Sequence, residues 1–415
     1  MARLVDFILL LFAVVTLPVW LPRMLIRGRH RTDWSARFGR TNDLGSAPAG
    51  GRVLLHAVSV GEVGAIRGLV DQLNAQTELD VVVASTTDTG IERARALFGQ
   101  TNTVVRWPLD LSWAVKRFLD AVGPTVVGLV ELEVWPNMTA DCARRGIDTV
   151  VVSGRLSQRS AKRYGWIAPL VRPMFRRVGH VAAQDVASAR RFEELGVPKA
   201  CVEVVGNMKW DSAGRALSHS DASQKLAEDL HISSDRLLVV GGSTAPGEDA
   251  LLRASLPEGP QLLCAPRRPE WWDDAASALL PCSRRSQHDR THVDRLLLDT
   301  IGDLSDAYAL ADIVVVGRSF GSLHGSDPIE PIARGAATII GPAVEDFVDV
   351  VQSLKDGGGL VQCTAEELPG ELARLVTDAE ARAAMVAAGR DVIQSKQGAT
   401  HRCADLLVHA SASSN

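Results

Sequence analysis

The sequence predicts an α/β protein of two domains, each built on a parallel sheet covered by helices, with an apolar segment preceding them. The first observation is length, because 415 residues exceed what one ordinary hydrophobic core organises. The second is composition, since few aromatics and abundant Ala, Gly and Val suit helices packed on parallel strands. The third is a rhythm of short β-branched runs and longer helical patterns that occurs twice along the chain.

A polar stretch separates the two rhythms, and each rhythm predicts one domain. The strands expected in the first domain are Val53 to Leu55, Val81 to Ala84, Val126 to Val130, Thr149 to Val152 and Val181 to Ala183. Those expected in the second are Leu237 to Val240, Leu262 to Ala265, Ile313 to Val316 and Thr338 to Ile340. We therefore predict a membrane anchor with a basic flank at 1–30, a first domain at 31–211, a linker at 212–235 and a second domain at 236–415. Two facing domains of this kind bind ligands at the carboxyl ends of their strands, so functional residues are expected in the loops that follow.

The N-terminal segment is predicted to associate with a membrane. Phe7 to Leu21 is apolar apart from Thr16 and Pro18. It is short of the roughly 20 residues of a perpendicular spanning helix, so it either just spans or lies in the interface. A cleaved signal peptide is the alternative, but no small-x-small cleavage site follows. Arginines follow instead, at 23, 27, 29, 31, 37 and 40, and such a flank predicts a body on the cytoplasmic side.

Composition argues against nucleic acid and metal as partners. The formal net charge is -4, and the body of the chain has no basic run interleaved with aromatics. The six cysteines are scattered without a C-x-x-C pair, so neither a zinc site nor a disulfide framework is predicted. Neither H-E-x-x-H nor Asp-x-Asp occurs, and we expect chemistry without a metal.

Acidic positions follow two strands of the first domain. The first strand leads into HAVSVGE at 56–62, which places Glu62 in the first turn of a helix. The helix dipole ordinarily explains an acid there, but the position also suits a general base at the edge of a cleft. A later strand ends in ELEVWPN at 131–137, where Glu131 and Glu133 are costly unless they are used or paired. A salt-bridged loop is the alternative for that motif.

Candidates for binding phosphate and ribose lie in the second half of the chain. Lys209, in GNMKWD, can meet a phosphate as a point charge, although most exposed lysines do not. GGST at 241–244 can present backbone N–H groups to an anion, and Arg267 can pair with phosphate through its planar fork. Glu330, in a first helical turn after a Gly-rich loop, is placed to accept hydrogen bonds from ribose hydroxyls. A helix-start carboxylate is again the alternative.

Together these motifs resemble the 3-deoxy-D-manno-octulosonic acid (Kdo) transferases, a glycosyltransferase family with the GT-B architecture of two facing Rossmann-like domains. The likeness covers nearly the whole chain. Besides the apolar leader and its basic flank, it includes HAVSVGE at 56–62, ELEVWPN at 131–137, SGRLSQRS at 153–160, GNMKWD at 206–211, GGST at 241–244, APR at 265–267, DTIGDL at 299–304 and DPIEP at 327–331. Each motif alone is weak, whereas their order and spacing together are specific.

The resemblance implies an inverting, metal-independent transfer of Kdo from CMP-Kdo to a lipid A precursor (lipid IVA) in lipopolysaccharide core biosynthesis. It implies Glu62 as the base, and Glu131 and Lys209 as residues that stabilise the transition state. The implied CMP site comprises Pro266, Arg267, Ile301, Gly302, Asp303, Asp327, Pro328, Ile329 and Glu330. The implied partners are the two substrates and the cytoplasmic surface of the bacterial inner membrane, with no further cofactor and no nucleic acid.

The donor half departs from the family pattern. Arg268 stands where a His is usual, Arg318 where a Gly is usual and Asp327 where an Asn is usual. An added Asp repels a CMP phosphate, and the added arginines offset that repulsion. Three alternatives follow: a GT-B transferase with another nucleotide sugar donor or acceptor, a catalytically silent membrane-bound homologue, and a nucleotide-sugar epimerase. The retained charged residues argue against a silent homologue, and the apolar leader argues against an epimerase.

Overall fold

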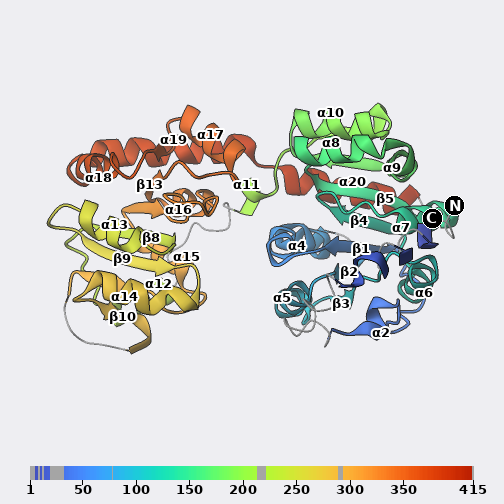
Figure 1. The fold of residues 1–415 in the computed structure, drawn as a ribbon, viewed down its shortest axis with the longest axis horizontal. Coiled ribbons are helices and arrows are strands. Elements are labelled where there is room, and N and C mark those ends of the chain that lie inside the picture. Colours follow the sequence, from blue (N-terminus) through green and yellow to red (C-terminus); the bar gives the residue numbers. More distant parts are fainter. Residues whose placement is uncertain are drawn as a thin grey trace. The chain divides into compact units, whose positions relative to one another are not determined.

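The computed structural model describes residues 5–7, 10–11, 14–18, 32–76, 78–212, 221–287 and 293–413. The chain forms two compact units, one from Met1–Met208 with Gln397–Asn415 and the other from Lys209–Lys396 (Figure 1). Each unit contains a seven-stranded sheet whose paired strands are parallel. The predicted pair of parallel α/β domains is therefore confirmed.

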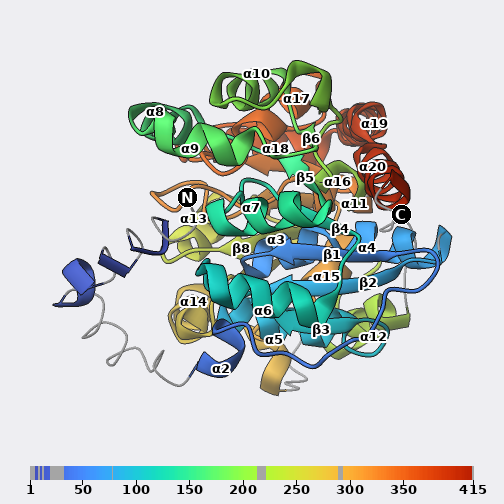
Figure 2. The ribbon, with the colours of Figure 1, turned by 90° about the vertical axis from the view of Figure 1, so that its right-hand side faces the viewer.

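The first sheet has the strand order β3-β2-β1-β4-β5-β6-β7. Its strands are β1 Arg52–Ala57, β2 Asp80–Ser85, β3 Thr103–Arg106, β4 Val126–Val130, β5 Asp148–Gly154, β6 His180–Ala183 and β7 Val202–Val204. The helices that alternate with them are α3 Val60–Ala65, α4 Arg67–Gln76, α5 Asp88–Phe98, α6 Ser112–Val122, α7 Pro136–Arg145, α8 Gln158–Trp166, α9 Ala168–Phe175 and α10 Val186–Leu195. Strands β1, β2 and β3 lie side by side in both views (Figures 1 and 2). From β1 and β4 the chain continues in opposite directions across the sheet, which opens a crevice at their carboxyl ends.

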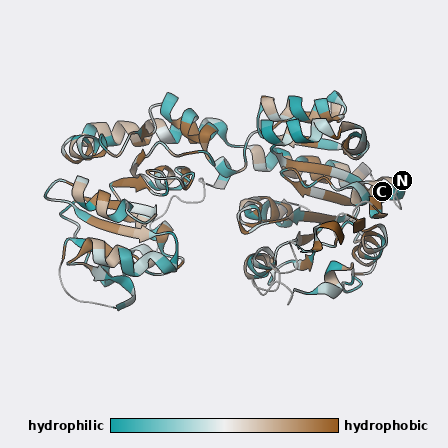
Figure 3. Ribbon diagram, viewed as in Figure 1, coloured by the Kyte–Doolittle hydropathy of each residue, from teal (hydrophilic) through white to brown (hydrophobic). Residues whose placement is uncertain are grey.

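How deeply a strand is buried explains whether it could be predicted from the sequence. The strands are mostly hydrophobic (Figure 3), and β1 and β4 are buried at every position because helices cover both faces. The edge strands β3 and β7 escaped prediction because they are short and partly exposed, so their patterns are weak.

The last helix, α20 (Ala399–Ser413), packs on the first sheet. The structure thus differs from the expected second domain of 236–415, because the second unit runs from Lys209 to Lys396. The apolar face of a terminal helix suits either of two sheets, so local sequence does not say which one it covers. The buried residues of this helix that join the core around β1 and β4 are Ala399, Cys403, Ala404, Leu407 and Ala410.

The second sheet has the order β10-β11-β9-β8-β12-β13-β14. Its strands are β8 Leu238–Thr244, β9 Gln261–Pro266, β10 Ser283–Arg284, β11 Arg295–Leu297, β12 Ile313–Val316, β13 Ala337–Ile340 and β14 Val361–Gln362. The helices of this unit are α11 Lys209–Ser212, α12 Asp221–Asp229, α13 Glu248–Ser255, α14 Trp272–Leu279, α15 Leu304–Leu310, α16 Ile329–Arg334, α17 Val348–Asp356, α18 Leu368–Thr377 and α19 Ala379–Lys396. The predicted linker at 212–235 contains α12, and its residues 213–220 lie outside the described residues. Here β8 and β12 are the central neighbours from which the chain continues in opposite directions.

Much of the predicted anchor, including residues 19–30, lies outside the described residues. Within the described part of the chain, no helix has the length and apolarity needed to cross a membrane. Asp6 of the leader contacts the first unit, because its carboxylate accepts hydrogen bonds from the Ser112 N–H at 2.8 Å and from the Asn137 amide at 3.0 Å. The leader therefore reaches the amino ends of α6 and α7, beside the carboxyl edge of the first sheet.

Candidate active site

Glu62 is fixed in the first turn of α3, directly after β1. Its Oε2 accepts a hydrogen bond from the Val58 N–H at 2.9 Å, and its Oε1 accepts one from the Ser59 hydroxyl at 2.8 Å. Ser59, the N-cap residue, in turn accepts from the Glu62 N–H. The pair resembles a capping box, except that Glu62 accepts the N–H of Val58 and not that of Ser59. Glu62 therefore has a structural role, and the same bonds hold its partly exposed side chain at the carboxyl edge of the sheet.

Two further glutamates lie near Glu62. Glu131 follows β4 in a left-handed conformation with a φ of 59°. Burial raises the pKa of Glu133, and the charges of Glu62 and Glu131 raise it further, whereas a hydrogen bond from the Trp135 indole lowers it. The charges of Glu62 and Glu131 thus act on Glu133. Groups of acids whose environments differ are the arrangement from which enzymes derive separate acid and base roles.

A buried acid from another segment fixes the loop that carries Glu131. Asp110 accepts hydrogen bonds from the N–H groups of Asn137 and Met138, both at 2.9 Å, at the start of α7. Burial raises the pKa of Asp110 to about 7, although these two N–H groups lower it. Because α7 has no side-chain cap of its own, Asp110 supplies the acceptor for its first turn.

His56, in the same motif as Glu62, packs the core. Its ring stacks on Trp107 with centroids 3.8 Å apart, and its Nε2 lies 2.8 Å from the Thr86 hydroxyl. Burial lowers the pKa of His56 to about 3. The ring is therefore neutral near pH 7 and supplies no charge to the site.

In the second unit, the charges of three predicted site residues act on the buried hydroxyl of Tyr308 in α15. Burial raises the pKa of Tyr308, the charges of Glu330 and Asp327 raise it further, and Arg267 and a hydrogen bond with Ser243 lower it. Ser243 has a left-handed φ of 56° where the register between β8 and β9 shifts. Arg267 comes from one part of the sequence and Asp327 and Glu330 from another, and the charges of all three act on Tyr308. We call these five residues the Tyr308 cluster.

Lys209 also reaches the Tyr308 cluster. Its ammonium lies 4.8 Å from the centroid of the Phe347 ring, within the range of a cation–π interaction. Burial raises the pKa of Asp327, whereas the charge of Lys209 lowers it. Asp327 also accepts a hydrogen bond from the Ile329 N–H at 2.9 Å, and Pro328 caps α16 between them. The segment at 327–330 is thus tied to α11.

The other predicted donor residues lie close by in the fold. Pro266 ends β9, and the turn at 301–303 directly precedes α15, the helix that carries Tyr308. In that turn Ile301 is 83% exposed, and Asp303 accepts a hydrogen bond from the Thr300 hydroxyl at 2.7 Å. Helix α15 therefore links the turn to the Tyr308 cluster.

The predicted set falls into two groups. Glu62 and Glu131 lie in the first unit, whereas Lys209 and the predicted CMP-binding residues lie in the second. Each group is assembled within its own unit. Among the described residues, no group of three or more His, Cys, Asp or Glu side chains is arranged to hold a metal ion.

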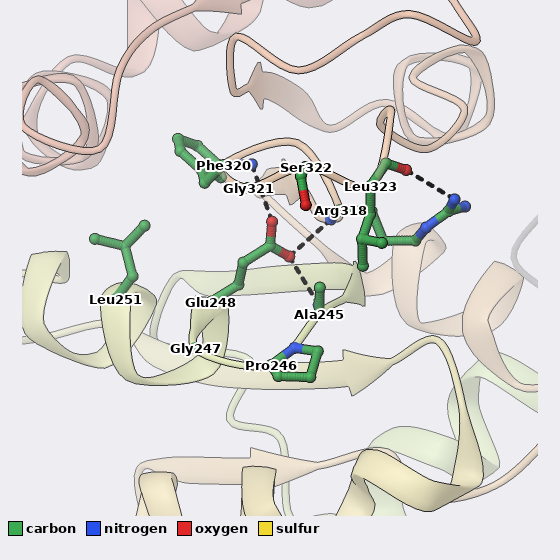
Figure 4. Close-up of a pocket in the computed structure, with 10 residues that line it drawn as sticks. All are labelled: Ala245, Pro246, Gly247, Glu248, Leu251, Arg318, Phe320, Gly321, Ser322 and Leu323. Atoms are coloured by element: carbon green, nitrogen blue, oxygen red, sulfur yellow. Dashed lines mark hydrogen bonds between the residues drawn. The ribbon is translucent and has the colours of Figure 1, made fainter.

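Glu248 ties together two loops beside the Tyr308 cluster. Its buried carboxylate accepts four backbone hydrogen bonds, from Ala245 at 2.8 Å, Arg318 at 2.7 Å, and Ser319 and Phe320 at 3.0 Å each. Figure 4 draws those from Ala245, Arg318 and Phe320. The loops after β8 and β12 are thereby joined at the carboxyl ends of neighbouring strands. They enclose a pocket of about 460 Å³. The residues that line this pocket are Ala245, Pro246, Gly247, Glu248, Leu251, Arg318, Phe320, Gly321, Ser322 and Leu323.

Sequence reasoning missed Tyr308, Asp110, the hydrogen bond between Ser243 and Tyr308, and the bonds made by Glu248. Each acts through partners that are distant in the sequence, and Glu248 and Arg318 are 70 positions apart. The available signal at Tyr308 was a polar side chain within the apolar run Ala307–Leu310, and the structure shows this side chain to be buried. Such a residue requires a partner, but the sequence does not identify the partner.

Comparison with known proteins gives consistent matches. A family model described as 3-Deoxy-D-manno-octulosonic-acid transferase (kdotransferase) matches residues 32–212. The 3-deoxy-D-manno-octulosonic acid transferase of Haemophilus influenzae is 33% identical to this chain over 396 residues, which cover 91% of each protein. The enzyme of the same name from Bordetella pertussis is 32% identical over 395 residues, which cover 90% of each. A solved glycosyltransferase structure from Rickettsia africae has a TM-score of 0.60 at 12% identity, over 86% of this chain and 98% of its own, a likeness of fold alone.

Proposed function

This chain belongs to the 3-deoxy-D-manno-octulosonic acid (Kdo) transferase family, and from that premise we propose that it transfers Kdo from CMP-Kdo to a lipid A precursor. As a member of this family it is a glycosyltransferase. The observation that carries the proposal is Glu62, whose carboxylate is held by Val58 and Ser59 at the carboxyl edge of the first sheet. Ligands of open α/β sheets bind at that edge.

In the proposed reaction, Glu62 takes the proton from an acceptor hydroxyl while that oxygen bonds to the anomeric carbon of Kdo. The bond from this carbon to the phosphate oxygen breaks, and its electron pair leaves with CMP. Attack opposite to the leaving group inverts the anomeric centre. Each Glu62 oxygen accepts one hydrogen bond from the loop, and each retains a lone pair for the acceptor hydroxyl. Glu131 offsets the positive charge that develops on the sugar.

The second unit is proposed to bind the CMP half of the donor. Arg267 pairs with the phosphate through its planar fork, and Glu330, in the first turn of α16, accepts hydrogen bonds from the ribose. Lys209, beside Asp327, offsets the negative charge that leaves with CMP. Pro266 and the turn at 301–303 complete the proposed site. Its support is the electrostatic coupling of Arg267, Asp327 and Glu330 to Tyr308.

We place the reaction at the cytoplasmic face of the bacterial inner membrane. The leader side chains Phe7, Val14 and Val15 are 63%, 65% and 67% exposed, and Trp166 at the end of α8 is 88% exposed. Apolar side chains left in water favour an interface, and the arginines that follow the leader favour anionic headgroups. This combination supports a lipid-borne acceptor and a membrane-associated leader.

The test is a comparison of donors. The full-length protein is incubated with a lipid A precursor and, in separate reactions, with CMP-Kdo or UDP-N-acetylglucosamine, and the products are identified by mass. We expect added Kdo with the first donor and unchanged precursor with the second. Transfer of N-acetylglucosamine without transfer of Kdo would reassign the donor. Absence of any transfer by the folded protein would contradict an active transferase of this specificity.

A further inference from the structure

Arg318 holds an unfavourable backbone conformation in the pocket of Figure 4. It directly follows Gly317 at the end of β12, and its φ of 59° lies in the left-handed region that residues with a Cβ rarely adopt. Strain of this kind persists only where the surroundings impose it, and it concentrates at functional sites. The strained backbone therefore suggests that the Arg318 side chain has a function.

The surroundings of Arg318 fix its backbone on both sides. Its N–H donates to Glu248 Oε2 at 2.7 Å, and its carbonyl accepts a hydrogen bond from the Gly325 N–H at 2.8 Å. The next residue, Ser319, donates from its N–H to Glu248 and from its hydroxyl to Val316 O at 2.6 Å. The direction in which the Arg318 side chain leaves the backbone is thus set before any ligand binds, which lowers the entropy lost on binding.

The Arg318 guanidinium extends away from the Glu248 carboxylate and donates from Nη2 to Leu323 O at 2.8 Å (Figure 4). That partner is a neutral carbonyl, so it orients the guanidinium without compensating its charge. Among the ten described residues that line the pocket, Arg318 supplies the one cationic side chain. The negative charge of Glu248 is spread over four N–H donors on the loops. The pocket therefore offers a cation to a ligand at the side opposite Glu248.

The pocket lies where this fold places its ligands. It is formed by the loops after β8 and β12, the neighbouring strands at which the chain reverses its direction across the sheet. Ala245 of the pocket is two residues beyond Ser243, which belongs to the Tyr308 cluster. The pocket therefore adjoins the proposed CMP site, and its volume of about 460 Å³ is in the range of small-molecule sites.

We propose that this pocket receives the sugar of the donor and that Arg318 binds the carboxylate of that sugar. The inference rests on the proposed function, because the sugar transferred by the family is an octulosonic acid. Its carboxylate is ionised near pH 7, and the planar guanidinium matches a carboxylate with two parallel hydrogen bonds. Arg318 thus acts as a specificity residue that selects an acidic sugar over a neutral one.

The test separates binding of the sugar from binding of the nucleotide. The KM for CMP-Kdo and the inhibition constant of CMP are measured for the wild type, Arg318→Gln and Arg318→Gly, the last of which suits the left-handed backbone. Both variants should raise the KM by about ten- to a hundredfold, the effect of losing a charged hydrogen bond. The inhibition constant of CMP should change less than about twofold. The matched control is Arg253→Gln, because Arg253 also donates to a backbone carbonyl, that of Ala278, and lies on α13 outside the pocket.

An unchanged KM in both variants would overturn the inference, and so would an equal loss of affinity for CMP and CMP-Kdo. The proposed function fails separately, if the wild type transfers no Kdo. In that case direct titration with CMP-Kdo and with CMP still decides the role of the pocket. A preference for CMP-Kdo that depends on Arg318 would sustain the inference, and its absence would refute it.

Discussion

Left-handed residues with side chains gather at the carboxyl edges of both sheets. Glu131 and Ser153 have φ values of 59° and 53° at the ends of the neighbouring strands β4 and β5. Ser243 and Arg318 have φ values of 56° and 59° at the ends of the neighbouring strands β8 and β12. Two separate sheets thus carry the same kind of strain at the same edge. The other left-handed residues with side chains among the described residues, His231 and His324, are not at strand ends, and strain of this kind is often found at functional sites.

The Glu248→Gln variant tests whether this acid holds the strained loop. An amide offers one acceptor oxygen and turns its NH₂ group toward N–H donors, so two of the four backbone hydrogen bonds are lost. We expect a loss of about 1–3 kcal/mol in the free energy of unfolding of the second unit. Hydrogen exchange at the amides of Arg318, Ser319 and Phe320 should accelerate. Exchange and stability equal to those of the exposed control Glu258→Gln would refute this role.

Asp110 makes stability depend on pH. Its pKa is raised from an ordinary 3.8 to about 7 in the folded protein, so the folded state holds an additional proton between these values. The contribution of this proton to the free energy of unfolding is fully present below about pH 4 and is lost as the pH rises through about 7. At about 1.4 kcal/mol per pKa unit, the loss amounts to up to a few kcal/mol. The thermal midpoint should therefore fall more between pH 5 and pH 8 in the wild type than in Asp110→Asn. Equal slopes in the two proteins would contradict the assignment, with the exposed Glu92→Gln as the control.

At the scale of elements, the sequence predicts what is buried on both faces. Val126 to Val130 was predicted as a strand and is β4, because a short run rich in valine without polar residues is typical of an interior strand. The strands β3 and β7 escaped prediction because half-exposed edges of three or four residues have no such run. The position of α20 also escaped prediction. Its amphipathic pattern predicts a helix, but the sheet that it covers is decided by packing over more than 180 residues of intervening chain.

The Leu407→Ala variant tests the position of α20. Leu407 is fully buried in the core formed with β1 and β4, so truncation leaves a cavity in the first unit. We expect a loss of about 2–5 kcal/mol in the free energy of unfolding of that unit. Asp405→Ala, an exposed position on the same helix, should have less effect. Equal urea midpoints for the two variants would mean that α20 does not stabilise the first sheet.

At the scale of the whole molecule, the motifs and the fold class could be predicted from the sequence. The residues that interact electrostatically with the predicted site residues could be identified only in the structure. Arg267 and Glu330 were predicted because each follows a strand, a position that local pattern reveals. Tyr308, on which both charges act, was not predicted, because its hydrogen bond with Ser243 and the influence of Arg267 arise only in the folded chain. Glu62 was predicted in part. Its place in the first turn of a helix follows from the sequence, but the nearby charges of Glu131 and Glu133 are a property of the folded unit.

The chemistry proposed for the whole molecule uses protein cations in place of a metal. Lys209 and Arg267 are assigned to the charge that leaves with CMP. The rate of Kdo transfer should therefore change less than about twofold when a chelator is added, because no metal ion contributes to lowering the activation free energy. Loss of activity with the chelator and its restoration by a divalent cation would contradict this assignment.

The most direct test of the account is the initial rate of Kdo transfer to a lipid A precursor by the wild type, Glu62→Gln and Glu78→Gln. Glu78 is an exposed carboxylate of the same unit and serves as the matched control. The account predicts that the wild type and Glu78→Gln add Kdo at similar rates, whereas Glu62→Gln is slower by about 10²–10⁴-fold with its fold retained. A Glu62→Gln variant that transfers Kdo at the wild-type rate would contradict the assignment of Glu62 as the base.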